Sequence, residues 1–141
     1  MNKICTDLSQ SQKLLKLGIP LETADMCWTN HLFGNILSSM RIESTPPNEY
    51  KNLLDKFVVR GYLIEPAWSL SALLELMPFH IIDNNVRYGF KQWKGFDSKG
   101  ETYCFEYVSN DGICLSETHH LNNPIDACYE MIIKLNEQKL L

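Results

Sequence analysis

The sequence predicts an α+β fold, in which helices pack on one face of a three- or four-stranded antiparallel sheet. Amphipathic helical stripes recur in three separate segments, 8–17, 69–77 and 124–138. Alternating apolar and polar residues over 87–119, divided by short glycine-containing turns, indicate an antiparallel meander. The 141 residues, 45% hydrophobic and 21% charged, predict a single globular domain over 1–141.

The first predicted helix, 8–17, has clear signals at both ends. Gly18 can end it in the left-handed conformation, and Pro20 prevents its continuation. Three residues at its start can accept hydrogen bonds from the free amide groups: Thr6, Asp7 and Ser9.

Between this helix and the next, residues 19–64 are the least legible part of the chain. ETADMCWTNHLF is consistent with a strand that leads to a loop, YKNLLDKF with a short helix and VVRGYLIE with an extended segment. The fold of residues 27–64 is not predicted.

The second predicted helix lies in the segment PAWSLSALLELMP, residues 66–78. Ser69 can cap the helix, Trp68 can pack down onto it, and Pro78 stops it. Its apolar stripe consists of Leu70, Leu73, Leu74 and Met77. Every residue type here is explained by core formation, so the segment is interpreted as structural.

The meander is predicted from its two turns. The turn DSKG places Gly100 where a hairpin loop favours positive φ, and SNDG ends in a second such glycine, Gly112. On the middle strand, one face carries Tyr103, Phe105 and Tyr107, and the other carries Thr102, Cys104, Glu106 and Val108. Aromatic pairing across strands is expected on the first face.

The last helix, 124–138, is predicted from its cap and its stripe. Asn123 is the expected N-cap, Pro124 stands at the first helical position, and Asp126 lies in the first turn, where the helix dipole favours an acid. Its apolar face consists of Cys128, Met131, Ile132 and Leu135.

Charge and cysteine content restrict the location and the partners. The net charge of -4 gives no general attraction for nucleic acid or anionic lipid. The cysteine count is odd, five, and no pair has CxxC spacing; no signal-peptide core or membrane span is recognisable. The sequence therefore predicts a cytoplasmic protein with reduced thiols and no membrane association.

No catalytic residue, cofactor or metal site is predicted. His119 and His120 are adjacent on a strand and point to opposite faces, so a regular strand cannot bring both to one ion. Cys104 and Cys114 could approach these histidines from neighbouring strands, but cysteines among strand aromatics are typically small buried hydrophobes. An enzyme that uses Cys114 with His119 is the least favoured hypothesis.

The segment VRYGFKQWKGF, residues 86–96, is the one feature that indicates a binding surface. It interleaves cations with aromatic residues and contains no acid. On a regular strand Arg87, Lys91 and Trp93 share one face, which could bind single-stranded nucleic acid by stacking and by phosphate contacts. Alternatively, one face is core and the other is ordinary surface, or the exposed apolar side chains mark a homodimer interface.

Three segments together resemble a group of small uncharacterised proteins of Bacteroides-type bacteria, often associated with prophages or mobile elements: LGIPLETADM (17–26), PAWSLSALLELMP (66–78) and NPIDACYEMIIKL (123–135). The resemblance implies a bacterial, cytoplasmic, prophage-derived protein, and it implies no catalytic residues. We therefore expect a non-enzymatic protein that binds itself as a homodimer or binds another protein. Single-stranded nucleic-acid binding through Arg87, Lys91 and Trp93 is the alternative.

Overall fold

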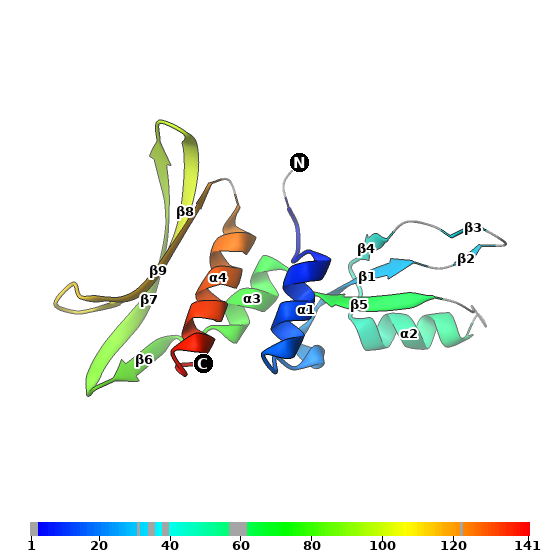
Figure 1. Ribbon diagram of the computed structural model, residues 1–141, viewed down its shortest axis with the longest axis horizontal. Coiled ribbons are helices and arrows are strands. Elements are labelled where there is room, and N and C mark those ends of the chain that lie inside the picture. The colour runs from blue at the N-terminus through cyan, green and yellow to red at the C-terminus, as the bar shows by residue number, and fades with distance from the viewer. Residues whose placement is uncertain (1–2, 31, 34–35, 38–39, 57–61, 122) are drawn as a thin grey trace. The chain divides into compact units, whose positions relative to one another are not determined.

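The computed structural model describes residues 3–30, 32–33, 36–37, 40–56, 62–121 and 123–141 (Figure 1). The chain divides into two compact units: the C-terminal unit, Met1–Ile4 with Leu73–Leu141, and the N-terminal unit, Cys5–Ala72. Helices combine with antiparallel sheets of three and four strands, which confirms the predicted α+β class. That 1–141 folds as one domain stays a prediction.

The four-stranded sheet of the C-terminal unit is the predicted meander with one added strand. Its strands are β6 (His80–Asp83), β7 (Val86–Asp97), β8 (Gly100–Ser109) and β9 (Cys114–Leu121), in the order β6-β7-β8-β9 and antiparallel throughout. Gly100 and Gly112 have φ of 127° and 80°, as the turn sequences predict. The added strand β6 pairs with β7 through a turn in which Asn84 and Asn85 both have positive φ.

Helix α4 (Pro124–Glu137) covers one face of this sheet (Figure 1). Asn123 caps it, as predicted, by accepting from the Asp126 amide at 3.1 Å. The predicted stripe is fully buried: Cys128, Met131, Ile132 and Leu135. Thr118 on β9 donates to the Ala127 carbonyl at 2.7 Å, which fixes the helix to the strand beneath it.

The aromatic face of β8 forms the core beneath α4. Phe90 of β7 stacks on Phe105 at 5.9 Å and lies 5.4 Å from the Tyr107 ring, which confirms the predicted cross-strand pairing. Tyr107 is fully buried and donates its hydroxyl to the Pro78 carbonyl at 2.6 Å. Burial raises its pKa above the usual range for tyrosine.

Helix α3 (Leu70–Leu76) contains the point at which the two units divide. Ser69 caps it as predicted, because its hydroxyl accepts from the Ala72 amide at 3.3 Å. Leu73 is fully buried, and the Met77 sulfur lies 3.3 Å from the Cys128 thiol. The Leu-rich segment is therefore core, as its composition indicates.

The N-terminal unit contains the three-stranded sheet that the sequence did not predict. Its elements are α1 (Leu8–Lys16), the 3₁₀ turn η1 (Leu21–Thr23), β1 (Met26–Asn30), the short pair β2 (Leu32–Phe33) and β3 (Ile36–Leu37), β4 (Arg41–Glu43), α2 (Pro47–Lys56) and β5 (Leu63–Ala67). The sheet has the order β4-β1-β5, and α1 and α2 both lie against β5. None of the described helices is long and apolar enough to cross a membrane.

Candidate functional site

The face of the four-stranded sheet that points away from α4 carries the candidate site. We call it the open face, because no described element of the C-terminal unit covers it (Figure 1). Its residues alternate with those that pack under α4: Arg87, Lys91 and Trp93 on β7, Cys104 and Glu106 on β8, and Cys114, Glu117 and His119 on β9.

The three residues singled out from the sequence do share this face. Arg87 and Lys91 are exposed, and the Trp93 side chain is 49% exposed. Ile82 of β6 pairs with Arg87 and extends the same face with a side chain that is 65% exposed. The Arg87 guanidinium also lies 3.4 Å from Nδ1 of His80.

Trp93, Cys104 and His119 form one row across three neighbouring strands, because they are register partners. The Trp93 and His119 rings meet edge to face at 6.1 Å. Between them, the Cys104 Sγ lies 2.9 Å from Nδ1 of His119. These two rings cover the cysteine, which is only 2% exposed although it lies on an open sheet surface.

Lys91, Glu106 and Glu117 form the adjacent row in the same way. The two carboxylates therefore lie directly opposite each other on β8 and β9. His119 Nε2 lies 3.5 Å from Oε2 of Glu117, which joins this row to the Trp93 row. The residues of the two rows thus form one continuous polar cluster.

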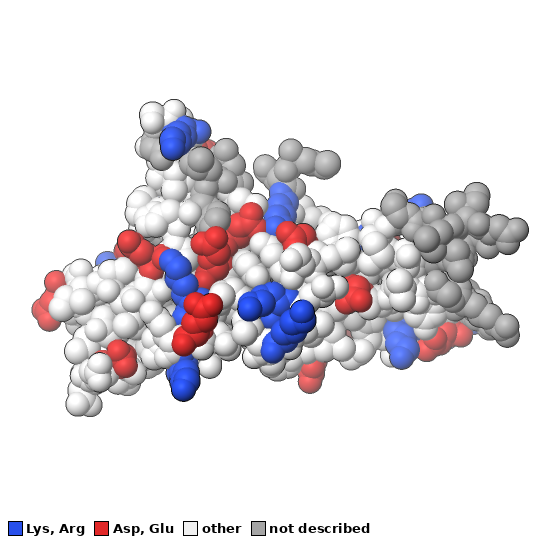
Figure 2. All heavy atoms as spheres, viewed as in Figure 1, with Lys and Arg blue, Asp and Glu red and all other residues white. Residues whose placement is uncertain are grey.

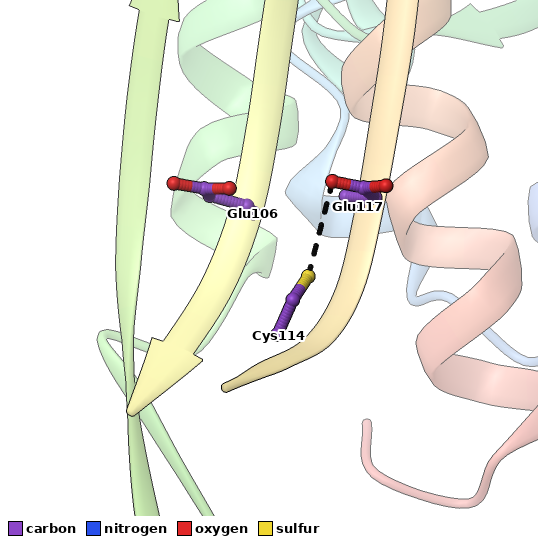
Figure 3. Close-up of side chains that lie close together, drawn as sticks. All are labelled: Glu106, Cys114 and Glu117. Carbon is purple, nitrogen blue, oxygen red and sulfur yellow. Dashed lines mark hydrogen bonds between the residues drawn. The ribbon is translucent and has the colours of Figure 1, made fainter. Parts of the chain in front are cut away.

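A β-bulge brings Cys114 into this cluster. Ser116 pairs with Tyr107 but Cys114 pairs with Val108, so Leu115 is the extra residue on β9. Without the bulge, Cys114 would share the buried face with Ser116, since side chains alternate along a strand. With it, the Cys114 thiol lies 4.0 Å from Oε2 of Glu117 (Figure 3).

Both thiols of the open face remain protonated at neutral pH. Burial, followed by the negative charges of Glu106 and Glu117, raises the pKa of Cys104. Burial and the same two carboxylates raise the pKa of Cys114, with smaller opposing contributions from a Ser116 backbone hydrogen bond and Lys134. A nucleophilic cysteine needs a cation or a helix N-terminus that lowers its pKa, so this cluster does not activate a thiol.

The cysteine nearest to the His119 ring is Cys104, whereas Cys114 contacts Glu117. In this cluster Cys114 therefore lies beside Glu117, and not beside His119 as in the enzyme hypothesis considered from the sequence. Glu106 and Glu117 are acid–base candidates in the sequence, but their spacing alone does not predict that the two carboxylates meet. Their proximity follows from the SNDG turn and the β8–β9 register, and the bulge has no clear signal in the sequence.

Charge is divided across the open face. The cations, Arg87 and Lys91, lie on β7, and the carboxylates, Glu106 and Glu117, lie on β8 and β9. Neither carboxylate forms an ion pair with a lysine or arginine among the described side chains. Over the surface displayed in Figure 2, by contrast, basic and acidic side chains are interspersed, and no extended basic patch is visible there.

Comparison of the chain with protein-family models, with curated proteins and with solved structures found no match.

Proposed function

We propose that the protein is a non-enzymatic binding protein and that its open face binds a second copy of the chain. The observation that carries this proposal is the division of charge on that face. A surface with cations on one side and carboxylates on the other is complementary to itself. Self-complementary patches are what a two-fold dimer requires.

The strand direction defines the geometry of this dimer. When two open faces meet about a two-fold axis parallel to the strands, β7 of one copy lies over β8 and β9 of the other. Lys91, which lies in the same row as Glu106 and Glu117, then opposes these carboxylates of the second copy, and the reciprocal contact forms at the same time. Arg87 lies four residues further along β7 and adds positive charge beside this contact. A two-fold axis perpendicular to the strands would place cations over cations, which disfavours that arrangement.

Exposed apolar side chains supply further buried area to the interface. Trp93 and Ile82 are large, 49% and 65% exposed, and located on this face. Interfaces are enriched in aromatic residues at their centres and carry charged groups at their rims. The proposed dimer would bury both side chains, which lie on either side of the Lys91–Glu106–Glu117 row along the strands.

Single-stranded nucleic acid is the second candidate, and the neighbouring carboxylates argue against it. Arg87, Lys91 and Trp93 are the residue types that bind phosphate and stack on bases. Glu106 and Glu117 lie beside them on the same face, so a phosphate backbone crossing it would meet as many acids as bases. An oligonucleotide bound in a salt-dependent manner that requires Trp93 would favour this candidate over the dimer.

We also propose a cytoplasmic location in a bacterium, with the prophage association that the sequence resemblance implies. All five cysteines are free thiols, Cys114 of them exposed, which suits a reducing compartment.

Sedimentation velocity of the full chain tests the proposal. We expect a species of twice the 16.3 kDa chain mass at low salt, weakened at high salt because screening reduces the charge contacts between the two copies. The double variant Arg87→Glu, Lys91→Glu is expected to raise the dissociation constant roughly a hundredfold, since like charges then oppose each other.

The matched control is Lys51→Glu, Lys56→Glu, which reverses two exposed lysines of α2 and makes the same change in net charge. It is expected to dimerise as the native chain does. A native chain that remains monomeric, or equal effects of the two double variants, would contradict the proposal.

A further inference from the structure

Three metal-binding groups converge at the carboxylate side of the open face: the carboxylates of Glu106 and Glu117 and the thiol of Cys114 (Figure 3). One ligand atom from each lies within 4.8 Å of the other two. Glu106 is half-buried, and Glu117 and Cys114 are exposed, so an ion could reach all three from solvent.

Two independent features of the sheet produce this convergence. The β8–β9 register places Glu106 opposite Glu117, and the bulge at Leu115 rotates Cys114 onto their face. Like charges directly opposite each other on a sheet are destabilising. No described lysine or arginine forms an ion pair with either carboxylate, although the Lys134 ammonium donates to the Glu117 backbone carbonyl at 2.6 Å. A bound cation would therefore further relieve this repulsion.

The donor set indicates the class of ion. A thiolate favours zinc and similar borderline ions over magnesium or calcium, and carboxylates also ligate zinc. Ligand atoms of a tetrahedral zinc ion are about 3.5 Å apart, given bond lengths of roughly 2.0–2.3 Å. The 4.0 Å between the Cys114 Sγ and Oε2 of Glu117 is close to this separation. Rotation of the Glu106 side chain can bring its carboxylate, which lies within 4.8 Å of the other two ligand atoms, to a similar distance.

We propose that Glu106, Cys114 and Glu117 bind one zinc ion per chain, with water completing the coordination. The thiol gives up its proton to solvent on binding and ligates as a thiolate. The sequence predicts no metal site because it contains no recognisable metal-ligand motif. The spacing of residues along the sequence does not reveal the β-bulge that brings Cys114 to the two carboxylates. This inference goes beyond the proposed dimer, because all three ligands come from one chain. The two share Glu106 and Glu117, so bound zinc would compete with the cations of a second copy for these carboxylates.

Isothermal titration of the chelator-treated full chain with zinc tests the site. We expect one ion per chain, and we expect Cys114→Ser and Glu117→Gln each to weaken binding by about tenfold or more, because even losses of supporting groups around a metal cost about 10- to 100-fold. The control is Glu137→Gln, which removes an exposed carboxylate on α4 and should leave the affinity unchanged. Native and variant chains are first compared by circular dichroism.

Cobalt gives a second readout that does not depend on any variant. Substitution of cobalt for zinc in the native chain is expected to produce the near-ultraviolet charge-transfer absorption of a cobalt–thiolate bond, and Cys114→Ser is expected to abolish it. A native chain that takes up no zinc would overturn the proposal. So would zinc binding that both ligand variants retain, or that Glu137→Gln weakens equally.

The zinc experiment can therefore distinguish a failure of the zinc proposal from a failure of the dimer proposal. The Arg87→Glu, Lys91→Glu chain keeps all three ligands, and it is expected to bind one zinc ion per chain whether or not it dimerises.

Discussion

At the scale of single residues, the most unusual position is Cys104, which is covered although it lies on the open face. Its cover consists of the rings of Trp93 and His119. The position of the Trp93 ring depends in turn on Gly95, because a Cβ atom built there would come within 2.8 Å of the indole. The absence of a side chain at position 95 thus gives the indole room to lie flat against the strand.

Gly95→Ala is therefore expected to displace the Trp93 ring. The indole N–H signal of Trp93 should shift in the ¹⁵N–¹H spectrum, while those of Trp28 and Trp68 stay in place, since their N–H groups donate to Thr6 and Thr23. Gly89→Ala is the matched control on the same strand and face, because its Cβ would meet only the Val108 carbonyl, at an ordinary 3.9 Å. An unshifted Trp93 signal in Gly95→Ala, or an equal shift in Gly89→Ala, would show that glycine does not set the ring position.

At the scale of elements, the attachment of α4 to β9 determines which face of the sheet remains open. The buried Thr118 hydroxyl donates to the Ala127 carbonyl in the first turn of α4. Its neighbours in the strand, Glu117 and His119, point to the opposite face. The alternation of side chains along β9 therefore both attaches α4 to one face of the sheet and places Glu117 and His119 on the other face.

Thr118→Val is expected to lower the free energy of unfolding by about 1 kcal/mol, because valine keeps the shape and the strand preference but loses the hydrogen bond. Urea unfolding followed by circular dichroism measures this change. Ser98→Ala, which removes a hydroxyl from the exposed β7–β8 turn, should leave stability within about 0.5 kcal/mol of the native value. If Thr118→Val unfolds at the native urea concentration, the hydrogen bond does not anchor the helix.

The elements that the sequence predicts well are those whose ends carry their own signals. Asn123 with Pro124 marks the start of α4, and Gly100 and Gly112 mark the turns of the meander. Strand β6 was missed because the Asn84–Asn85 turn is a weaker signal than one with glycine. The three-stranded sheet was missed because β1 pairs with β4 and β5, which follow it at long and different distances along the chain.

The candidate site was predictable only in part, for the same physical reason. Alternation along β7 correctly groups Arg87, Lys91 and Trp93 on one face, because it is a property of a single strand. Their relation to Glu106 and Glu117 depends on pairing between strands. The approach of Cys114 depends on one additional residue in β9, which local composition does not reveal.

At the scale of the whole molecule, the account depends on an open face that is complementary to itself. Net charge gives no guide to this property, because a chain of charge -4 can still present equal numbers of cations and carboxylates on one face. Either half of this charge pattern, the cations or the carboxylates, can be reversed by two substitutions. Two oppositely reversed chains should then recognise each other in place of themselves.

Mixing such chains is the most direct test of the central claim. We expect Arg87→Glu, Lys91→Glu and Glu106→Lys, Glu117→Lys each to sediment as a monomer, because each opposes like charges across the two-fold axis. An equimolar mixture is expected to sediment as a dimer, because one chain then presents only acids and the other only bases. A dimer formed by either variant alone, or a mixture that remains monomeric, would contradict the account.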